Sequence, residues 1–207
     1  MQPYTLCYYS ATAMEMPSLS EGVRQYLDAG GDISVHARTQ TQLFDKSRQR
    51  AFVDQAVKAD AIIVTLHGGK PSFPAFDQLI EALDALPEEK RPFLHIQPTG
   101  GDEDSVEAAR EHSPVFGTPV WDDIQRYLGH GGHINYHQLL IYLYNHLFSA
   151  EETCQPAVVL PFEGIYHPDL SGIPDLDDYL KEKVDPDKPT VGLWFYQTYW
   201  LNNNLAF

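Results

Sequence analysis

Short, continuous hydrophobic runs alternate in the first half of the chain with stretches in which apolar residues recur every three or four positions. The clearest run covers residues 61–66, and its length and β-branched content are typical of a strand buried on both faces. It ends at a glycine turn, residues 67–69, after which an apolar stripe with helical spacing covers residues 76–83. The pattern predicts a strand, a tight turn and a helix, and the rest of the chain is organised around this unit.

The same alternation predicts four strands joined by helices. The strands are expected over residues 5–12, 33–37, 61–66 and 92–98, with helices that begin at Pro17, at Asp45 and after Pro74. Such alternation implies parallel strands joined by right-handed crossovers. We therefore expect an α/β fold with a doubly wound, mostly parallel sheet of the flavodoxin or Rossmann type. In such a sheet, ligands usually bind at the carboxyl ends of the strands.

From residue 104 onward the pattern changes to helices, and the helices expected over 121–128 and 136–148 form a C-terminal helical pair. The expected elements are helices over 105–111, 121–128 and 136–148, a short strand over 158–160, a short acidic helix over 175–183, and a strongly apolar strand over 189–200.

These elements divide the chain into three predicted parts. Residues 1–150 form the α/β domain with its helical end, residues 151–188 form a Pro- and Gly-rich linker with the short acidic helix, and residues 189–207 begin a second α/β unit. A buried parallel strand needs a crossover to cover it, and none follows the last strand. We therefore expect the second unit to be truncated in this chain.

The composition fits a folded protein, with 43% hydrophobic residues and no run near the roughly 18 apolar residues of a membrane span. The N-terminus lacks the basic and apolar regions of a signal peptide, so we expect a cytoplasmic protein. The formal net charge of -15 disfavours nucleic acid and anionic membranes as partners. Cys7 and Cys154 match no metal or redox spacing and are expected to be unpaired thiols.

Two segments near the end of the chain are the most specific in sequence. One is residues 160–169, Leu-Pro-Phe-Glu-Gly-Ile-Tyr-His-Pro-Asp, and the other is residues 191–196, Val-Gly-Leu-Trp-Phe-Tyr, followed by Tyr199, Trp200, Leu201 and Asn203. Together they resemble the large subunit of cobaltochelatase and magnesium chelatase. In that family a Gly-Ile-Tyr-His-Pro segment leads into a Val-Gly-Leu-Leu-Phe-Tyr-Arg-x-x-Trp strand.

Two further stretches resemble the N-terminal region of the cobalt-type branch: residues 67–72 and the Tyr, Gly, Asn and Leu pattern of residues 127–140. The chain also departs from the family pattern. Gln197 and Thr198 stand where a basic residue is usual, and residues 202–204, Asn-Asn-Asn, replace the usual Gly-Asn-Thr.

The resemblance implies that the chain is the N-terminal region of a much larger subunit, which binds a tetrapyrrole and inserts Co2+ or Mg2+ as its metal substrate. In the cobalt branch the tetrapyrrole is a corrinoid precursor of cobalamin biosynthesis. ATP with Mg2+ acts through separate AAA+ partner subunits. We expect this region to hold no cofactor and no catalytic residue of its own, and to contribute to tetrapyrrole binding or subunit docking for this ligase-type reaction.

His67, Gly68, Gly69 and Lys70 are the first candidates for ligand binding. The turn would present backbone N–H groups and a cation to a carboxylate or phosphate at a helix start. It lacks the spacing of a P-loop, and the alternative is a tight turn whose glycines serve packing. A tetrapyrrole with acidic side chains suits such a turn.

Glu163, Tyr166, His167 and Asp169 are the second candidates, a polar cluster in an irregular loop of the kind that often carries sites. A histidine beside a carboxylate would hold a proton or contact an incoming metal ion. The alternative is an interdomain linker pinned by Tyr166 and the neighbouring prolines.

His133 and His137 are weaker, metal-binding candidates, because their i, i+4 spacing puts them on one helical face as in zinc-binding pairs. The glutamate of a zinc protease helix is absent between them, so exposed or capping histidines are the alternative. The aromatic residues Trp194, Tyr196, Tyr199 and Trp200 would either stack on a flat macrocycle or pack in a core or interface.

Two other functions remain as alternatives. One is a flavodoxin-like protein that binds a small molecule or nucleotide, although residues 10–14 match a Ser/Thr-rich phosphate loop poorly. The other is a purely structural head domain that touches no ligand.

Overall fold

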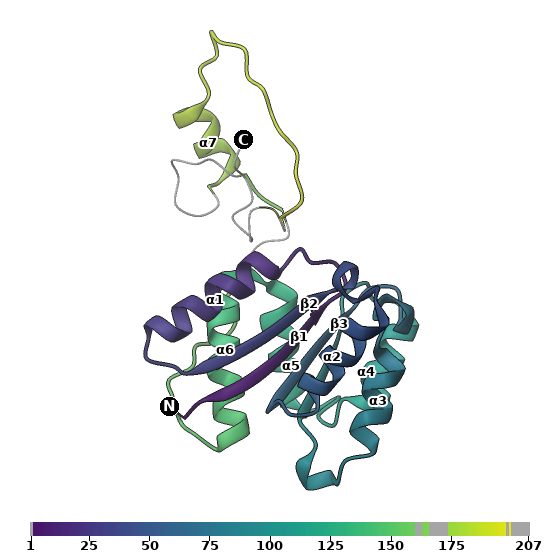
Figure 1. Ribbon diagram of the computed structural model, residues 1–207. Helices are drawn as coiled ribbons and strands as arrows, with labels where there is room; N and C mark the ends of the chain where they lie inside the picture. The colour runs from purple at the N-terminus through teal and green to yellow at the C-terminus, as the bar shows by residue number, and fades with distance from the viewer. Residues whose placement is uncertain (1, 160–162, 166–173, 198, 200–207) are drawn as a thin grey trace.

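The computed structural model describes residues 2–159, 163–165, 174–197 and 199. Its centre is a four-stranded parallel sheet of order β2-β1-β3-β4 (Figure 1). The strands are β1 (Tyr4–Ser10), β2 (Ile33–Thr39), β3 (Ala61–Leu66) and β4 (Phe93–Pro98). All four lie where the hydrophobic runs predict them, so the doubly wound α/β fold is confirmed.

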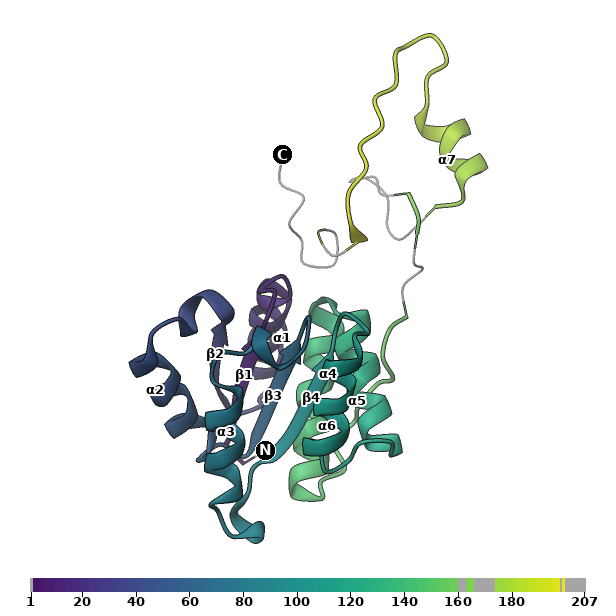
Figure 2. The same ribbon diagram turned by 90° about the vertical axis from the view of Figure 1, so that its right-hand side faces the viewer.

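Helices cover both faces of this sheet (Figures 1 and 2). One face carries α1 (Met16–Asp28), α5 (Pro119–His130) and α6 (Gly132–Phe148), and the other carries α2 (Lys46–Ala56), α3 (Phe76–Asp84) and α4 (Glu103–His112). Short 3-10 turns cover Gln40–Leu43, Lys70–Ser72 and Glu88–Lys90. Because successive side chains of a strand point to opposite faces, β1, β3 and β4 each contribute to two hydrophobic layers, whereas the apolar residues of β2 belong to one of them.

The two layers can be followed from β1. Cys7 and Tyr9 pack with Phe52 of α2 and Leu79 of α3, whereas Leu6 and Tyr8 belong to the layer under α1, α5 and α6. The strand order places β1 in the middle, between β2 and β3. The chain first moves from β1 to β2 and then returns across β1 to β3, which makes the carboxyl ends of β1 and β3 the topological switch point of the sheet.

The helices begin where side chains can satisfy their first N–H groups. Asp45, Asp102 and Thr118 cap α2, α4 and α5 by accepting hydrogen bonds from the first turn. Gly131 separates α5 from α6 with φ of 60°, a conformation that favours glycine. The helical pair predicted after β4 is therefore present, with each helix starting a few residues earlier than the apolar pattern indicates.

The strand expected over residues 189–200 is not formed in its described part: residues 189–196 have no regular secondary structure. The residues are strand-like in composition, but a strand needs a hydrogen-bonding neighbour, and each strand of the described sheet pairs only within that sheet. The described residues 158 and 159 of the short strand expected at 158–160 likewise lack regular structure. The acidic helix does form, as α7 (Leu176–Lys183).

Within the described part of the chain, none of the helices combines the length and the apolar character needed to cross a lipid bilayer.

Candidate functional site

The switch point of the sheet is filled by the carboxylate of Glu15. Ser10 and Thr65 lie opposite each other at the ends of β1 and β3, and the loop after β1 brings Glu15 over them. Thr65 Oγ1 donates to Glu15 Oε1 at 3.2 Å, and Thr12 Oγ1 donates to Oε2 at 3.1 Å. Tyr8 Oη also donates to Oε1, at 3.4 Å. Hydroxyl groups from β1, its following loop and β3 therefore converge on a single half-buried carboxylate.

Two buried tyrosines support this arrangement from below. The hydroxyl groups of Tyr8 and Tyr136 lie 3.0 Å apart, which ties β1 to α6. Burial raises the pKa of the Tyr8 hydroxyl well above its ordinary value, and the neighbouring Tyr136 and Glu15 raise that pKa further. Burial also raises the pKa of Tyr136. Both hydroxyls are therefore protonated at neutral pH, and Tyr8 is able to donate to Glu15.

The Glu15 cluster lies at the switch point, where α/β proteins of this topology usually bind ligands, and it disfavours an anionic ligand there. The phosphate of a flavin or nucleotide would meet the negative charge of Glu15 there, and like charges repel. The cluster could not be predicted from the sequence, because Thr65 and Tyr136 lie 50 and 121 residues from Glu15 along the chain. The one sign of the cluster in the sequence is Glu15 itself, in the loop after the first strand.

The turn of His67, Gly68, Gly69 and Lys70 has the open backbone that the sequence predicts. Gly68 and Gly69 have φ of 86° and 84°, a region that favours glycine. Their N–H groups do point at acceptors, but those acceptors belong to the chain itself. Gly68 N–H donates to Asp102 Oδ2 at 3.1 Å, and Gly69 N–H donates to Ser105 Oγ at 3.0 Å.

Asp102 therefore occupies the turn as a built-in carboxylate. It also caps α4 by accepting from Ser105 N–H at 2.8 Å and from Ser105 Oγ at 2.9 Å, so it joins the loop after β3 to the loop after β4. Partial burial acts to raise the pKa of Asp102, but the hydrogen bonds from Ser105 and Gly68 outweigh it and lower that pKa. The turn is thus able to hold a carboxylate, and it holds one already.

The two charged or titratable side chains of the turn are also engaged. Lys70 Nζ lies 3.1 Å from Glu111 Oε2 and 5.5 Å from the centre of the Phe76 ring. His67 Nδ1 lies 3.2 Å from Thr99 Oγ1 at the end of β4. The structure brings these residues together at one edge of the sheet, as expected, and their role in ligand binding remains a prediction.

The second candidate cluster falls largely outside the described residues. Glu163 is described and exposed, whereas Tyr166, His167 and Asp169 are not described.

His133 and His137 both lie on α6, as their spacing predicts. Burial lowers the pKa of His137, and its Nε2 has no hydrogen-bond partner among the described residues. Within that same part of the chain, no group of three or more His, Cys, Asp or Glu side chains is placed to hold a metal ion.

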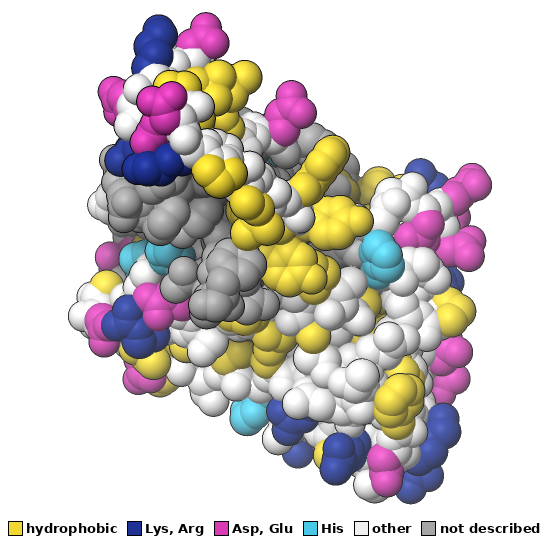
Figure 3. Space-filling model, turned by 90° about the horizontal axis from the view of Figure 1, so that it is seen from above, with side chains coloured by type: hydrophobic (Ala, Val, Ile, Leu, Met, Phe, Trp, Pro, Cys, Tyr) yellow, Lys and Arg dark blue, Asp and Glu magenta, His cyan; other side chains and the backbone are white. Residues whose placement is uncertain are grey.

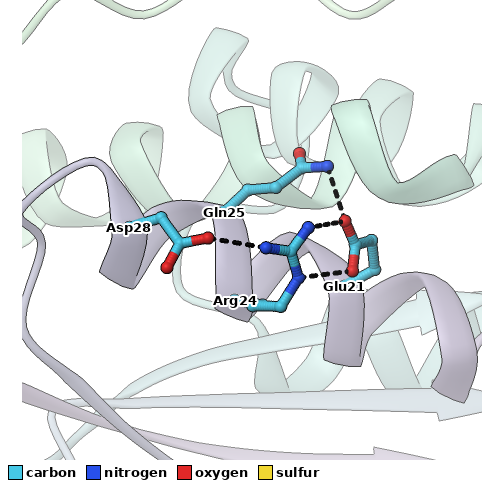
Figure 4. Close-up of polar contacts among 4 residues, drawn as sticks. All are labelled: Glu21, Arg24, Gln25 and Asp28. Carbon is cyan, nitrogen blue, oxygen red and sulfur yellow. Dashed lines mark hydrogen bonds and ion pairs between the residues drawn. The ribbon is translucent and has the colours of Figure 1, made fainter.

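The charged groups of α1 form an ordinary solvated helix face. On α1, Arg24 donates to both carboxylate oxygens of Glu21 at 2.8 and 2.5 Å and to Asp28 at 2.6 Å, while Gln25 donates to Glu21 at 3.0 Å (Figure 4). The hydrogen bonds from Arg24 and Gln25 lower the pKa of Glu21 to about 2. Such exposed pairs contribute little to stability and mark no site.

The described residues from 189 onward, which follow α7, expose large apolar side chains. We use the name arm for residues 189–197 and 199. Trp194 is 100% exposed, and Val191, Leu193 and Tyr196 are 84%, 66% and 76% exposed. Seen from above, hydrophobic side chains gather across one face of the molecule (Figure 3). A contiguous apolar surface of this kind usually marks a binding or docking surface.

The fold and these features define a doubly wound α/β domain whose usual ligand crevice is filled and whose C-terminal arm is exposed. Residues 125–207 match the family model described as CobN/Magnesium Chelatase, and this match confirms the resemblance over that part of the chain. The matched part runs from the middle of α5 through α6 and α7 to the arm.

Two similar proteins were found by comparison. The uncharacterized protein MJ0908 of Methanocaldococcus jannaschii is 28% identical over 159 residues, which cover 75% of this chain and 12% of that protein. The solved catalytic subunit of cobaltochelatase from Mycobacterium tuberculosis matches with a TM-score of 0.50 and 14% identity, over 80% of this chain and 12% of that chain. At this identity the structural match shows the fold alone. The chain therefore spans about an eighth of the length of either relative.

Proposed function

We propose that the chain is the head region of a chelatase-type large subunit, and that its arm contributes to binding the tetrapyrrole substrate of an ATP-dependent metal insertion. The metal substrate would be Co2+ or Mg2+, and ATP would be used by AAA+ partner subunits. The family match over residues 125–207 supports the class of protein. The proposal for the arm rests on one observation: the full exposure of Trp194 beside the exposed Tyr196.

The chemistry of the arm suits a flat macrocycle. Aromatic rings stack on other π-systems and bring large contact areas with few rotatable bonds. In the α/β domain, by contrast, the carboxylate of Glu15 lies at the switch point of the sheet and that of Asp102 occupies the glycine turn. The rival function, a flavodoxin-like nucleotide binder, is disfavoured because Glu15 lies where the phosphate would bind.

A titration tests the proposal directly. The purified chain would be titrated with the metal-free corrinoid hydrogenobyrinic acid a,c-diamide and, in parallel, with protoporphyrin IX, and the visible absorption bands of the macrocycle would be followed. We expect saturable binding of at least one of them that weakens at least tenfold in Trp194→Ala. Phe44→Ala is the matched control, because Phe44 is also exposed, at 74%, but lies after β2 on the α/β domain. Equal affinities of the Trp194→Ala variant and the unaltered chain would contradict the proposal.

A second function, docking of a partner subunit, is supported by the aliphatic members of the arm. Val191 and Leu193 offer no π face, and exposed aliphatic side chains beside aromatic ones are typical of protein interfaces. If neither macrocycle binds, the same variants would be tested for binding to the AAA+ subunits of a chelatase by isothermal titration calorimetry. Binding that Trp194→Ala abolishes and Phe44→Ala leaves unchanged would support docking.

The turn at His67 to Lys70 offers a further contact for the acidic side chains of a tetrapyrrole. Its geometry supports this role, because Gly68 N–H already binds the carboxylate of Asp102. A ligand carboxylate would have to displace Asp102. If the turn takes part, Asp102→Ala would strengthen binding of the macrocycle, whereas Lys70→Ala would weaken it.

A further inference from the structure

The chain that leaves α6 is fastened to the helices by a regular set of side-chain contacts. We call residues 151–158 the strap, and Figure 2 shows this stretch running alongside α5 and α6. It has no regular secondary structure, so its backbone N–H and C=O groups need partners from elsewhere. Those partners are four polar side chains: Tyr127 of α5 and Asn135, Gln138 and Asn145 of α6.

Both ends of the strap are held by asparagine side chains that donate and accept at the same residue. Asn145 accepts from Glu152 N–H at 2.9 Å and donates to Glu152 C=O at 2.8 Å. Asn135 accepts from Val158 N–H at 2.8 Å and donates to Val158 C=O at 2.9 Å. A primary amide is the side chain that can satisfy an N–H and a C=O together.

The middle of the strap is held in the same way by two residues. Gln138 Oε1 accepts from Gln155 N–H at 2.7 Å, and Tyr127 Oη donates to Gln155 C=O at 2.6 Å. Residues 152, 155 and 158 therefore have both backbone groups bound by side chains, so the contacts repeat every third residue. This is the repeat of an extended polyproline II segment, which has no internal hydrogen bonds and leaves its backbone open to such partners.

The helix side of these contacts is equally regular. Positions 135, 138 and 145 of α6 are separated by three and seven residues, which places them on one helical face. As the strap number rises from 152 to 158, the α6 partner falls from 145 to 135, so the strap runs antiparallel to the helix. Cys154 and Ala157 of the strap pack against the hydrophobic layer under α6. All four partner side chains lie within the matched residues 125–207.

We propose that Tyr127, Asn135, Gln138 and Asn145 form a clamp that fixes the strap to the α/β domain and thereby sets the point from which the C-terminal region departs. The start of the predicted linker is thus part of the domain up to Val158. Release of the clamp adds the eight strap residues to the tether, which lengthens its reach by roughly 26 Å at about 3.3 Å per residue. The clamp is a conformational device. It goes beyond the proposed function because its effect on the tether does not depend on which ligand or partner the arm binds.

Hydrogen exchange followed residue by residue by NMR tests the clamp. The amides of Glu152, Gln155 and Val158 should exchange at least tenfold more slowly, after correction for intrinsic rates, than those of Thr153, Cys154 and Ala157. The double variant Asn145→Leu/Gln138→Leu should remove this protection at residues 152 and 155 while the amides of α6 stay protected. Gln78→Leu is the matched control, because this half-buried amide bonds to Gln49 between α3 and α2, away from the strap. Uniformly fast exchange across the strap, or loss of protection throughout α6 in the double variant, would overturn the proposal.

A distance measurement tests the effect on the tether independently of any ligand. Spin labels at Arg50→Cys and Asp187→Cys, in a Cys154→Ser background, would report the distance between the α/β domain and the region after α7; Cys7 is buried and should not react. We expect the triple variant Asn135→Leu/Gln138→Leu/Asn145→Leu, which also frees Val158, to shift the distribution to longer distances and to broaden it. An unchanged distribution would refute the role of the clamp, and neither result depends on whether the chain binds a tetrapyrrole.

Discussion

Gly22 of α1 lies directly against Tyr136 of α6. A Cβ atom on Gly22 would lie 2.7 Å from Cβ of Tyr136 and 2.9 Å from the backbone nitrogen of His137. Contacts this short do not occur between real side chains, so the two helices approach each other closely only because residue 22 has no side chain. The same approach places the Tyr136 hydroxyl beside Tyr8 and supports the Glu15 cluster.

Gly22→Ala should therefore destabilise the domain, although alanine favours helices over glycine. Overpacking at a tight contact costs roughly 1–3 kcal/mol, which exceeds the gain of up to about 1 kcal/mol from helix propensity. Gly129→Ala is the control: Gly129 lies in α5 with open space around its Cβ position, so this change should raise the free energy of unfolding. Urea denaturation measures both, and a stabilising Gly22→Ala would show that α1 and α6 can separate at little cost.

His95 should make the domain sensitive to acid. It is fully buried in β4, with Nε2 3.1 Å from Gln97 Oε1, and burial lowers the pKa of His95 from 6.5 to about 4. Because the folded-state pKa is the lower one, the unfolded chain takes up this proton first. Stability is therefore lost as the pH falls from about 6.5 towards 4.

The expected loss from His95 alone between pH 7 and pH 5 is about 2 kcal/mol. His95→Leu removes the titrating group, so its free energy of unfolding should fall less than that of the unaltered chain over this range. Urea denaturation at the two pH values gives the comparison. Parallel losses in the two proteins would mean that His95 is not held neutral.

Asp102 and Asp45 make a matched pair of capping residues. Both accept from N–H groups in the first turn of a helix, but Asp102 also accepts from Gly68 N–H in the loop after β3. Asp102→Ala should therefore lower the free energy of unfolding more than Asp45→Ala, and it should speed hydrogen exchange at Gly68. The pKa of each aspartate is lowered in the folded state, so both contributions are present at neutral pH and are lost as the pH falls below about 4. Equal costs for the two variants would mean that the Gly68 contact adds nothing.

Replacement of Trp121 should lower the stability of the domain, whereas replacement of Trp194 should not. Trp121 is 8% exposed and packs against His95 and Phe116, so Trp121→Ala should cost roughly 3–5 kcal/mol of unfolding free energy. Trp194 is fully exposed, and Trp194→Ala should leave the unfolding transition unchanged. Thermal unfolding by circular dichroism measures both. A lowered transition in Trp194→Ala would show that the arm packs on the domain rather than offering a surface to a partner.

The sequence predicts the sheet well because each strand is a short apolar run and each helix carries an apolar stripe. Residues 61–66 were predicted to the residue, since the run is short, rich in β-branched residues and followed by a glycine turn. The strand expected at 189–200 illustrates the limit. Strand propensity describes how well side chains fit a pleated, half-buried surface, and it does not supply the neighbouring strand.

The polar features were harder to predict because they join residues far apart in the chain. Glu15 accepts a hydrogen bond from Thr65 of another strand, and Gly68 N–H donates one to Asp102 of another loop. The glycine turn was visible in the sequence, but its acceptor was not. The clamp on the strap likewise produces no hydrophobic pattern in the sequence from which it could be predicted, because it pairs polar side chains with backbone groups.

We expect the arm, and not the sheet crevice, to carry the contact surface for the tetrapyrrole. Backbone amide chemical shifts of the isotope-labelled chain, recorded during addition of hydrogenobyrinic acid a,c-diamide, test this most directly. The account predicts that the shifts change over residues 191–197 and stay constant at Thr12, Glu15 and Thr65. Shifts concentrated at those three residues, with the arm unaffected, would contradict it.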